Sequence, residues 1–114
     1  MSIVYKICSR TQWRDAERAG RFTGAAVDLA DGYIHFSTAD QARETAAKHF
    51  AGQDDLVLVA VDAARLGDLL KWEASRGGAL FPHLYGDLPL SAVLKVTALP
   101  LDDHGHHVFP EGLS

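Results

Sequence analysis

The sequence predicts an α+β fold, with a small mixed or split β-sheet and two main helices. The apolar run LVLVAV at residues 56–61 is uninterrupted, which is typical of a strand buried on both faces. Strand-like and helix-like segments alternate irregularly along the rest of the chain, unlike the regular repeat of an α/β protein. Together these observations favour α+β, with residues 56–61 in a central strand.

The first part of the chain predicts a strand, a helix, a loop and a second strand. Residues 3–8 form the first strand, and residues 9–20 form a helix capped by Ser9 or Thr11 and ended by Gly20. Residues 22–30 are expected to be an irregular loop that leads to a strand at residues 33–37.

The middle of the chain predicts the second main helix and the central strand. Thr38 and Gln41 have the spacing of a capping box, and they open a helix over residues 39–50 that stops before Gly52. The central strand at residues 54–62 follows, and then a short helical or turn-like excursion at residues 63–70.

Three strands and a tail complete the expected fold. The strands are predicted at residues 71–74, 79–84 and 91–101, the first two joined by a turn at residues 75–78. Residues 1–101 are therefore interpreted as a single domain, and residues 102–114 as a polar C-terminal tail. A metal site in the histidine-containing tail is not predicted, because its spacing matches no closed four-ligand pattern.

Composition limits the classes of function. The net charge of -4 and the isoelectric point near 5.8 argue against nonspecific nucleic-acid binding. One cysteine, Cys8, cannot form an internal disulfide, and the N-terminal segment has no apolar export signal. The longest apolar run is too short to cross a membrane. We expect a cytoplasmic protein without membrane contact, and no oligomeric state is predicted.

His35 is the first candidate site residue. The strand period of two places His35 and Ser37 on one face, just before a helix N-terminus that attracts anions. The two side chains are then candidates for contact with a phosphate or carboxylate, together with Thr38 and Gln41. The alternative is that His35 is a hydrogen-bonded core residue and that Thr38 and Gln41 only cap the helix.

A second candidate region is the aromatic stretch at residues 72–85. Phe81, His83 and Tyr85 share one strand face and are suited to hold a flat ring such as a nucleobase or nicotinamide, with Trp72 nearby. The alternative is an aromatic patch packed in the core. Glu73 is either an acid/base carboxylate or a solvated strand residue.

These segments occur in an order that resembles a known family. YIHFST at residues 33–38 and FPHLYG at residues 81–86 closely resemble a bacterial family of domains of unknown function, number nine-five-two. The resemblance covers residues 3–100 and implies an ADP-ribosyltransferase-like fold around an NAD-binding cleft.

A more distant resemblance is to NAD-dependent RNA 2'-phosphotransferases. It rests on IHFSTADQARETA at residues 34–46 and on the turn at residues 75–78, and it implies that His35 and Ser37 lie near an NAD cleft. The ribose-gripping segment of that family falls near Lys6, which becomes a candidate ligand-binding residue. The family's early histidine is absent here.

The leading hypothesis is a nucleotide-binding or NAD-binding domain, with chemistry of the ADP-ribosyl- or phosphotransferase type. His35, Glu73 and His83 are the candidate catalytic residues, Tyr85 would stack on the ligand, and Arg10 or Arg43 would contact a phosphate. The alternative is a noncatalytic regulatory or protein-interaction module on the same fold. In that case both histidines should be buried and bonded to backbone groups, with no adjoining cavity.

Overall fold

The α+β class is confirmed. The computed structural model describes residues 2–111 and 113; Met1 of the expected domain and Gly112 and Ser114 of the expected tail lie outside the described residues. The elements, in chain order, are β1 (Ile3–Ser9), α1 (Arg10–Ala19), β2 (Arg21–Phe22), α2 (Ala26–Asp31), β3 (Ile34–His35), α3 (Ala39–His49), β4 (Leu56–Asp62), β5 (Leu70–Ala74), β6 (Leu80–Leu84), β7 (Leu88–Pro89) and β8 (Val93–Leu99), with 3-10 helices at Ala63–Leu69, Arg76–Gly78 and Leu90–Ala92.

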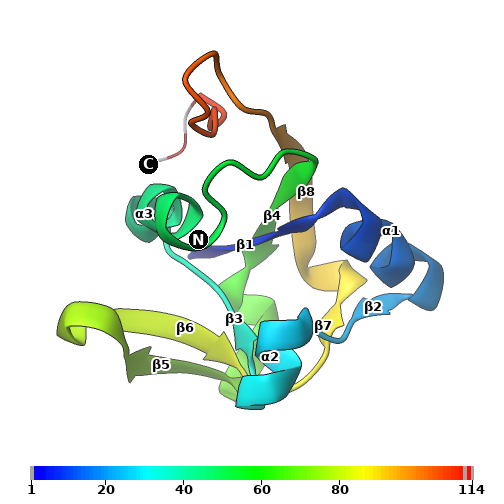
Figure 1. Ribbon diagram of the computed structural model, residues 1–114. Coiled ribbons are helices and arrows are strands. Elements are labelled where there is room, and N and C mark those ends of the chain that lie inside the picture. Colours follow the sequence, from blue (N-terminus) through cyan, green and yellow to red (C-terminus); the bar gives the residue numbers. More distant parts are fainter. Residues whose placement is uncertain (1, 112, 114) are drawn as a thin grey trace.

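The strands divide into separate sheets. The main sheet has the order β1-β4-β8, a second three-stranded sheet has the order β3-β6-β5, and β2 pairs with β7. Every pairing among the described strands is antiparallel. The two larger sheets are linked through β1, because Tyr5 forms a bridge with Ser37 directly after β3. This bridge holds the segment after β3 beside β1, while β5 and β6 extend away from the main sheet (Figure 1).

The central position of β4 is confirmed, and its side chains fill two cores. Val57, Val59 and Val61 belong to one cluster, while Leu56 and Leu58 belong to another. This alternation is the strand period of two, with both faces covered. Each fully buried Val or Leu contributes about 1.5–3 kcal/mol, so β4 is a main source of stability.

One main helix packs on each side of this sheet (Figure 1). Trp13 and Ala16 of α1 enter the first cluster, and Ala46 of α3 enters the second. Ser9 caps α1 and Thr38 caps α3, each in a capping box, as the spacing predicted for Thr38 and Gln41. Gly20 ends α1 in a left-handed conformation, which glycine adopts without steric cost.

The expected loop at residues 22–30 is wrong. The segment contains the end of β2 and most of α2. Apolar periodicity did not indicate α2, because its stabilising contacts are polar and one of them, with Lys6, comes from far along the chain. The carboxylate of Asp28 accepts a hydrogen bond from the backbone N–H of Ala25 at 2.8 Å and another from the ammonium of Lys6 on β1. The strand expected at residues 33–37 is also shorter, since β3 is limited to Ile34–His35.

The segment after β8 folds back on the domain. Leu101 forms a bridge with His107, whose Nε2 lies 2.7 Å from the carbonyl oxygen of Gln53. Phe109 packs against the second cluster and lies under Arg43 of α3. None of the helices in the described part of the chain combines the length and the hydrophobicity needed to span a bilayer.

Candidate functional site

A pocket of about 310 Å³ lies where β1, α3, β3 and β6 meet. Of the residues singled out from the sequence, it is lined by Lys6, His35, Ser37, Phe81 and His83. Most of its other walls are aromatic or aliphatic: Tyr5, Ile7, Val27, Tyr33, Phe36 and Phe50. A largely apolar hollow with a few converging polar groups is the usual form of a small-molecule site.

A buried ion pair lies beside this pocket, and Lys6, one of its members, also lines the pocket. Lys6 lies on the same face of β1 as Val4 and Cys8, both of which are buried in the first cluster. A buried ammonium requires a partner. Asp28 of α2 provides it: its two carboxylate oxygens lie 3.0 and 2.9 Å from Nζ of Lys6. Gly24 makes room, because a Cβ there would lie 2.9 Å from Cβ of Asp28.

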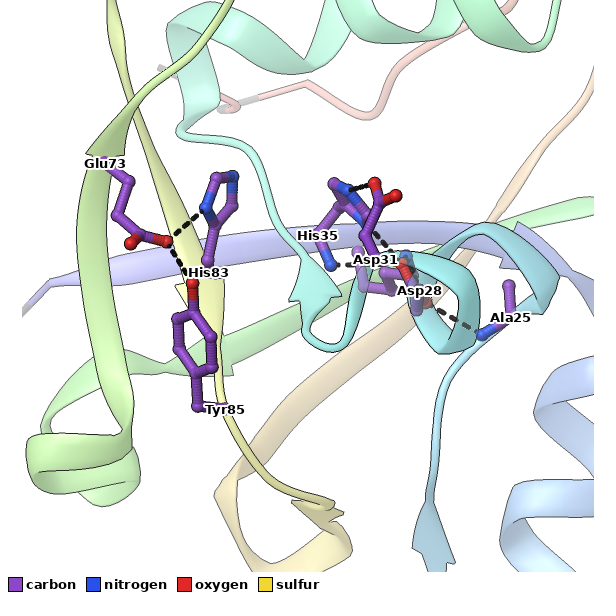
Figure 2. Close-up of polar contacts among 8 residues, drawn as sticks. Ala25, Asp28, Asp31, His35, Glu73, His83 and Tyr85 are labelled. Carbon is purple, nitrogen blue, oxygen red and sulfur yellow. Dashed lines mark hydrogen bonds and ion pairs between the residues drawn. The ribbon is translucent and has the colours of Figure 1, made fainter.

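Asp28 also holds His35. Its Oδ1 lies 2.6 Å from Nδ1 of His35 and accepts from the backbone N–H of the same residue at 3.1 Å. On the other side of the ring, Nε2 of His35 lies 2.9 Å from Oδ2 of Asp31. Both ring nitrogens therefore face carboxylate oxygens (Figure 2). With both carboxylates ionised, only an imidazolium can donate to the two at once.

The surroundings of Asp28 keep its carboxylate ionised. Burial alone would raise the pKa of Asp28, but the hydrogen bond from His35 and the charge of Lys6 outweigh burial and lower the pKa to about 2. Asp28 therefore remains ionised at every ordinary pH. Lys6, Asp28 and His35 are called the Lys6–Asp28–His35 cluster below. It fixes the ring of His35 at the pocket, and together with Asp31 it leaves neither nitrogen of the ring free.

His83 is the cross-strand neighbour of His35 in the β3–β6 pairing, but its setting is different. Its Nδ1 lies 2.7 Å from Oε1 of Glu73, and the hydroxyl of Tyr85 donates to the same oxygen at 2.7 Å. Figure 2 shows Glu73 on β5 approached by both side chains. The register places Lys71 opposite His83 and Glu73 opposite Phe81. Glu73 therefore reaches His83 diagonally across one face of the hairpin.

The ring of Tyr33 joins the two histidines. It stacks on His83 with centroids 4.1 Å apart and planes at 25°, and it is tilted against His35 at 4.7 Å. The rings of His35 and His83 are 5.6 Å apart, edge to face. Two imidazoles at this spacing can contact one small group, and imidazole is the side chain best suited to proton transfer near neutral pH.

The neighbouring ionisable groups have shifted pKa values, and each shift favours one protonation state at neutral pH. Hydrogen bonds from Tyr85 and His83 lower the pKa of Glu73, so it is a carboxylate. The hydrogen bond to Glu73 raises the pKa of Tyr85 to about 12. Burial, with Asp31 and Glu73 close by, raises the pKa of Tyr33. Both phenols therefore remain protonated at neutral pH.

Several residues proposed from the sequence do not line this pocket. Arg10 pairs with Asp55 through Nε at 3.0 Å, and Arg43 lies over the ring of Phe109. Trp72 is exposed on β5, opposite Pro82. Thr38 and Gln41 form the capping box of α3. The amide of Gln41 also donates to the carbonyl oxygen of Leu80 at 2.7 Å, which fastens α3 to β6.

Two other polar residues have structural surroundings. The hydroxyl of Ser37 lies 3.0 Å from that of Thr45 on α3, although Ser37 does line the pocket. Tyr85 contacts Glu73 and Tyr33 but is not one of the lining residues. Burial raises the pKa of the Cys8 thiol to about 12, so this thiol is unreactive.

Sequence reasoning missed Asp28, Asp31 and Tyr33. One signal was present: Lys6 occupies the inward-facing position between Val4 and Cys8 in an apolar strand, and a lysine there needs a carboxylate partner. That signal does not say which of the many carboxylates is the partner. Among the described residues, no three His, Cys, Asp or Glu side chains are grouped so as to hold a metal ion.

The fold and the pocket together define a small α+β domain with two carboxylate-held histidines side by side on neighbouring strands. The chain belongs to the family described as protein of unknown function (DUF952), whose model matches residues 7–96. The resemblance seen in YIHFST and FPHLYG is thus confirmed.

Solved structures of a bacterial protein are similar to this chain. The crystal structure of protein CC0527 from Caulobacter crescentus shares 55% identity, with a TM-score of 0.94 and 98% of each chain covered. The solution NMR structure of the same protein shares 58% identity, with a TM-score of 0.83 over 93% of this chain and 91% of that chain. Among curated proteins, no sequence matches this chain.

Proposed function

We propose that this chain is a cytoplasmic domain that binds a nucleotide or an NAD-like molecule in the histidine pocket, with chemistry of the ADP-ribosyltransferase or phosphotransferase type. The observation that carries the proposal is the pair of imidazoles 5.6 Å apart, His35 and His83, on an aromatic-lined pocket of about 310 Å³. The resemblance of residues 34–46 to NAD-dependent phosphotransferases supports NAD as the ligand.

The pocket suits the ring and ribose of such a ligand better than the whole molecule. Its volume is at the low end for sites of small molecules, which begin near about 300 Å³. A flat ring would contact Phe36, Phe50 and Phe81, and the polar groups of a ribose would face the histidines. Phosphates would extend outward, away from Lys6, whose ammonium is already paired.

The alternative, a noncatalytic regulatory or interaction module, agrees less well with the histidines. That reading expects both rings to be buried, bonded to backbone groups and without a cavity. His83 is buried, as that alternative expects, but the side chain of His35 is 32% exposed. The ring nitrogen contacts of both residues are to carboxylates, and both residues line the pocket. The exposed Trp72 and Leu80 on the β5–β6 hairpin are the surface such a module would use.

Calorimetric titration tests the proposal. NAD, ADP-ribose, AMP and nicotinamide are titrated into the wild-type protein at concentrations that reveal millimolar affinity. We expect binding of at least NAD or ADP-ribose, weakened by Phe81→Ala in the pocket wall. Trp72→Ala, an aromatic truncation at an exposed position of the same hairpin, is the matched control and should leave affinity unchanged. No heat with any of the four ligands contradicts the proposal.

A further inference from the structure

The two histidines differ in what they leave available to a ligand. Both ring nitrogens of His35 contact carboxylate oxygens. His83 uses only Nδ1 for its carboxylate contact. In Figure 2 its second ring nitrogen points away from Glu73, and the residue lines the pocket.

Glu73 determines which nitrogen of His83 carries the proton. A carboxylate can only accept, so Nδ1 at 2.7 Å from Oε1 must carry hydrogen. In a neutral imidazole the other nitrogen, Nε2, is then a bare acceptor. Tyr85 strengthens this assignment, because its hydroxyl donates to the same oxygen and helps to keep Glu73 ionised.

The ring of His83 is also held in place. The residue is 4% exposed, and Tyr33 covers one ring face at 4.1 Å. The ring therefore cannot flip without breaking the contact with Glu73 and disturbing the stack. A base that is oriented by a carboxylate and fixed by packing resembles the general bases of many enzymes, in which a third group orients the histidine.

We propose that His83 is the general base of this pocket, that Glu73 is its positioning residue, and that Nε2 takes a proton from a water or an acceptor hydroxyl. His35, with no free nitrogen, is assigned to shaping the pocket rather than to proton transfer. The identity of the ligand rests on the proposed function above, whereas the assignment of the base rests on the geometry of His83 alone.

With an NAD-like ligand and water, the reaction is hydrolysis of the bond between ribose and nicotinamide. Nε2 of His83 takes one proton from water as the water oxygen bonds to the ribose carbon that carries the nicotinamide. The carbon–nitrogen bond of that ribose breaks, and nicotinamide leaves with the electron pair. Glu73 stabilises the imidazolium formed, and the proton is then lost to solvent. An acceptor hydroxyl in place of water gives transfer instead of hydrolysis.

The first test reads the tautomer of His83 directly, without a ligand. In ¹⁵N-labelled wild-type protein at neutral pH, NMR of the ring nitrogens should show Nδ1 protonated and Nε2 bare. In Glu73→Ala this preference should weaken, whereas in Asp15→Asn, an exposed carboxylate change on α1, it should persist. A wild-type His83 protonated on Nε2 overturns the proposal.

The second test measures nicotinamide release from NAD in the wild-type protein and in His83→Ala. We expect kcat to fall by about 10²- to 10⁴-fold, the usual contribution of a general base, with KM little changed. Glu73→Gln should lower kcat less and move the acidic limb of its pH profile to lower pH, because an anion that stabilises imidazolium is lost. Glu73, Lys71, Tyr85, Tyr33 and His35 surround His83, and of these we expect Glu73 to shift the profile most.

The outcomes separate this inference from the proposed function. If NAD binds but the wild-type protein releases no nicotinamide, or His83→Ala releases it at the wild-type rate, the general-base assignment is overturned. If none of the titrated ligands binds, the proposed function fails, and the tautomer of His83 alone decides the assignment. His35→Gln provides the contrast, because it should change kcat far less than His83→Ala.

Discussion

The two carboxylate–histidine pairs of this protein are alike in chemistry and opposite in setting. Asp28 is 1% exposed and contacts Lys6, His35 and two backbone N–H groups. Glu73 is partly exposed on a hairpin, and its hydrogen bonds come from His83 and Tyr85. The comparison indicates that a buried pair of this kind holds the fold, whereas a partly exposed one is free to set the state of its histidine.

The largest effect, a loss of stability, should come from Asp28→Ala. The change leaves Lys6 buried without its partner, and removal of one member of a buried pair costs about 3–5 kcal/mol. Urea unfolding followed by circular dichroism measures the loss in free energy of unfolding. Asp31→Ala, which removes the exposed partner of the same histidine, is the control and should stay within about 1 kcal/mol of wild type. Equal losses in free energy of unfolding in the two variants would contradict the distinction between the buried carboxylate and the exposed one.

Low pH should destabilise the protein through the Lys6–Asp28–His35 cluster. The pKa of Asp28 is about 2 in the folded protein, below the ordinary aspartate value of 3.8. Its contribution, about 2 kcal/mol from a shift of this size, is fully present above pH 4 and is lost as pH falls toward 2. The difference in free energy of unfolding between wild type and Asp28→Asn should therefore narrow between pH 4 and pH 2. A constant difference would show that Asp28 is not held ionised by its partners.

Glu73→Gln should leave stability nearly unchanged. The glutamine oxygen can still accept from His83 and from Tyr85, and the site is on the surface of the hairpin. The midpoint of urea unfolding should match that of wild type, while the pH profile of ligand binding or turnover changes. A large drop in the midpoint would place Glu73 with Asp28 as a residue that holds the fold.

The smallest effect, a minor change in ligand binding, should come from Tyr85→Phe. Its hydroxyl contacts Glu73 at 2.7 Å, but the carboxylate keeps its contact with His83. Loss of this donor should raise the pKa of Glu73, as seen by ¹³C NMR of the carboxyl carbon. Binding should change less than in Glu73→Gln. If Tyr85→Phe has the greater effect, then the phenol itself contacts the ligand.

Local rules predicted the main framework well. The apolar run of β4, the caps at Ser9 and Thr38 and the stop at Gly20 all depend on neighbours in sequence, and all are present. The missing parts depend on distant partners. β2 and β7 have two residues each and pair only with one another, and α2 is anchored through the contact between Asp28 and Lys6.

The site was predicted only in part, because some of its contacts also depend on residues distant in sequence. The strand period placed His35 and Ser37 on one face of their strand, and Phe81 and His83 on one face of theirs, and all four line the pocket. The period says nothing about which distant carboxylates reach those rings, so Asp28 and Asp31 were missed. Charge type alone also suggested Arg10 and Arg43 as phosphate contacts. Their directions depend on Asp55 and Phe109, which no local rule selects.

The most direct test of the account is to follow the histidine ring resonances by NMR while NAD or ADP-ribose is added. We predict that the signals of His83 and His35 shift with ligand, and that those of His104 and His106 in the C-terminal turn stay in place. The shift at His83 should be the larger, because Nε2 is its free atom. Ligand binding that moves the tail histidines and leaves His83 unchanged would contradict the claim that this pocket is the functional site.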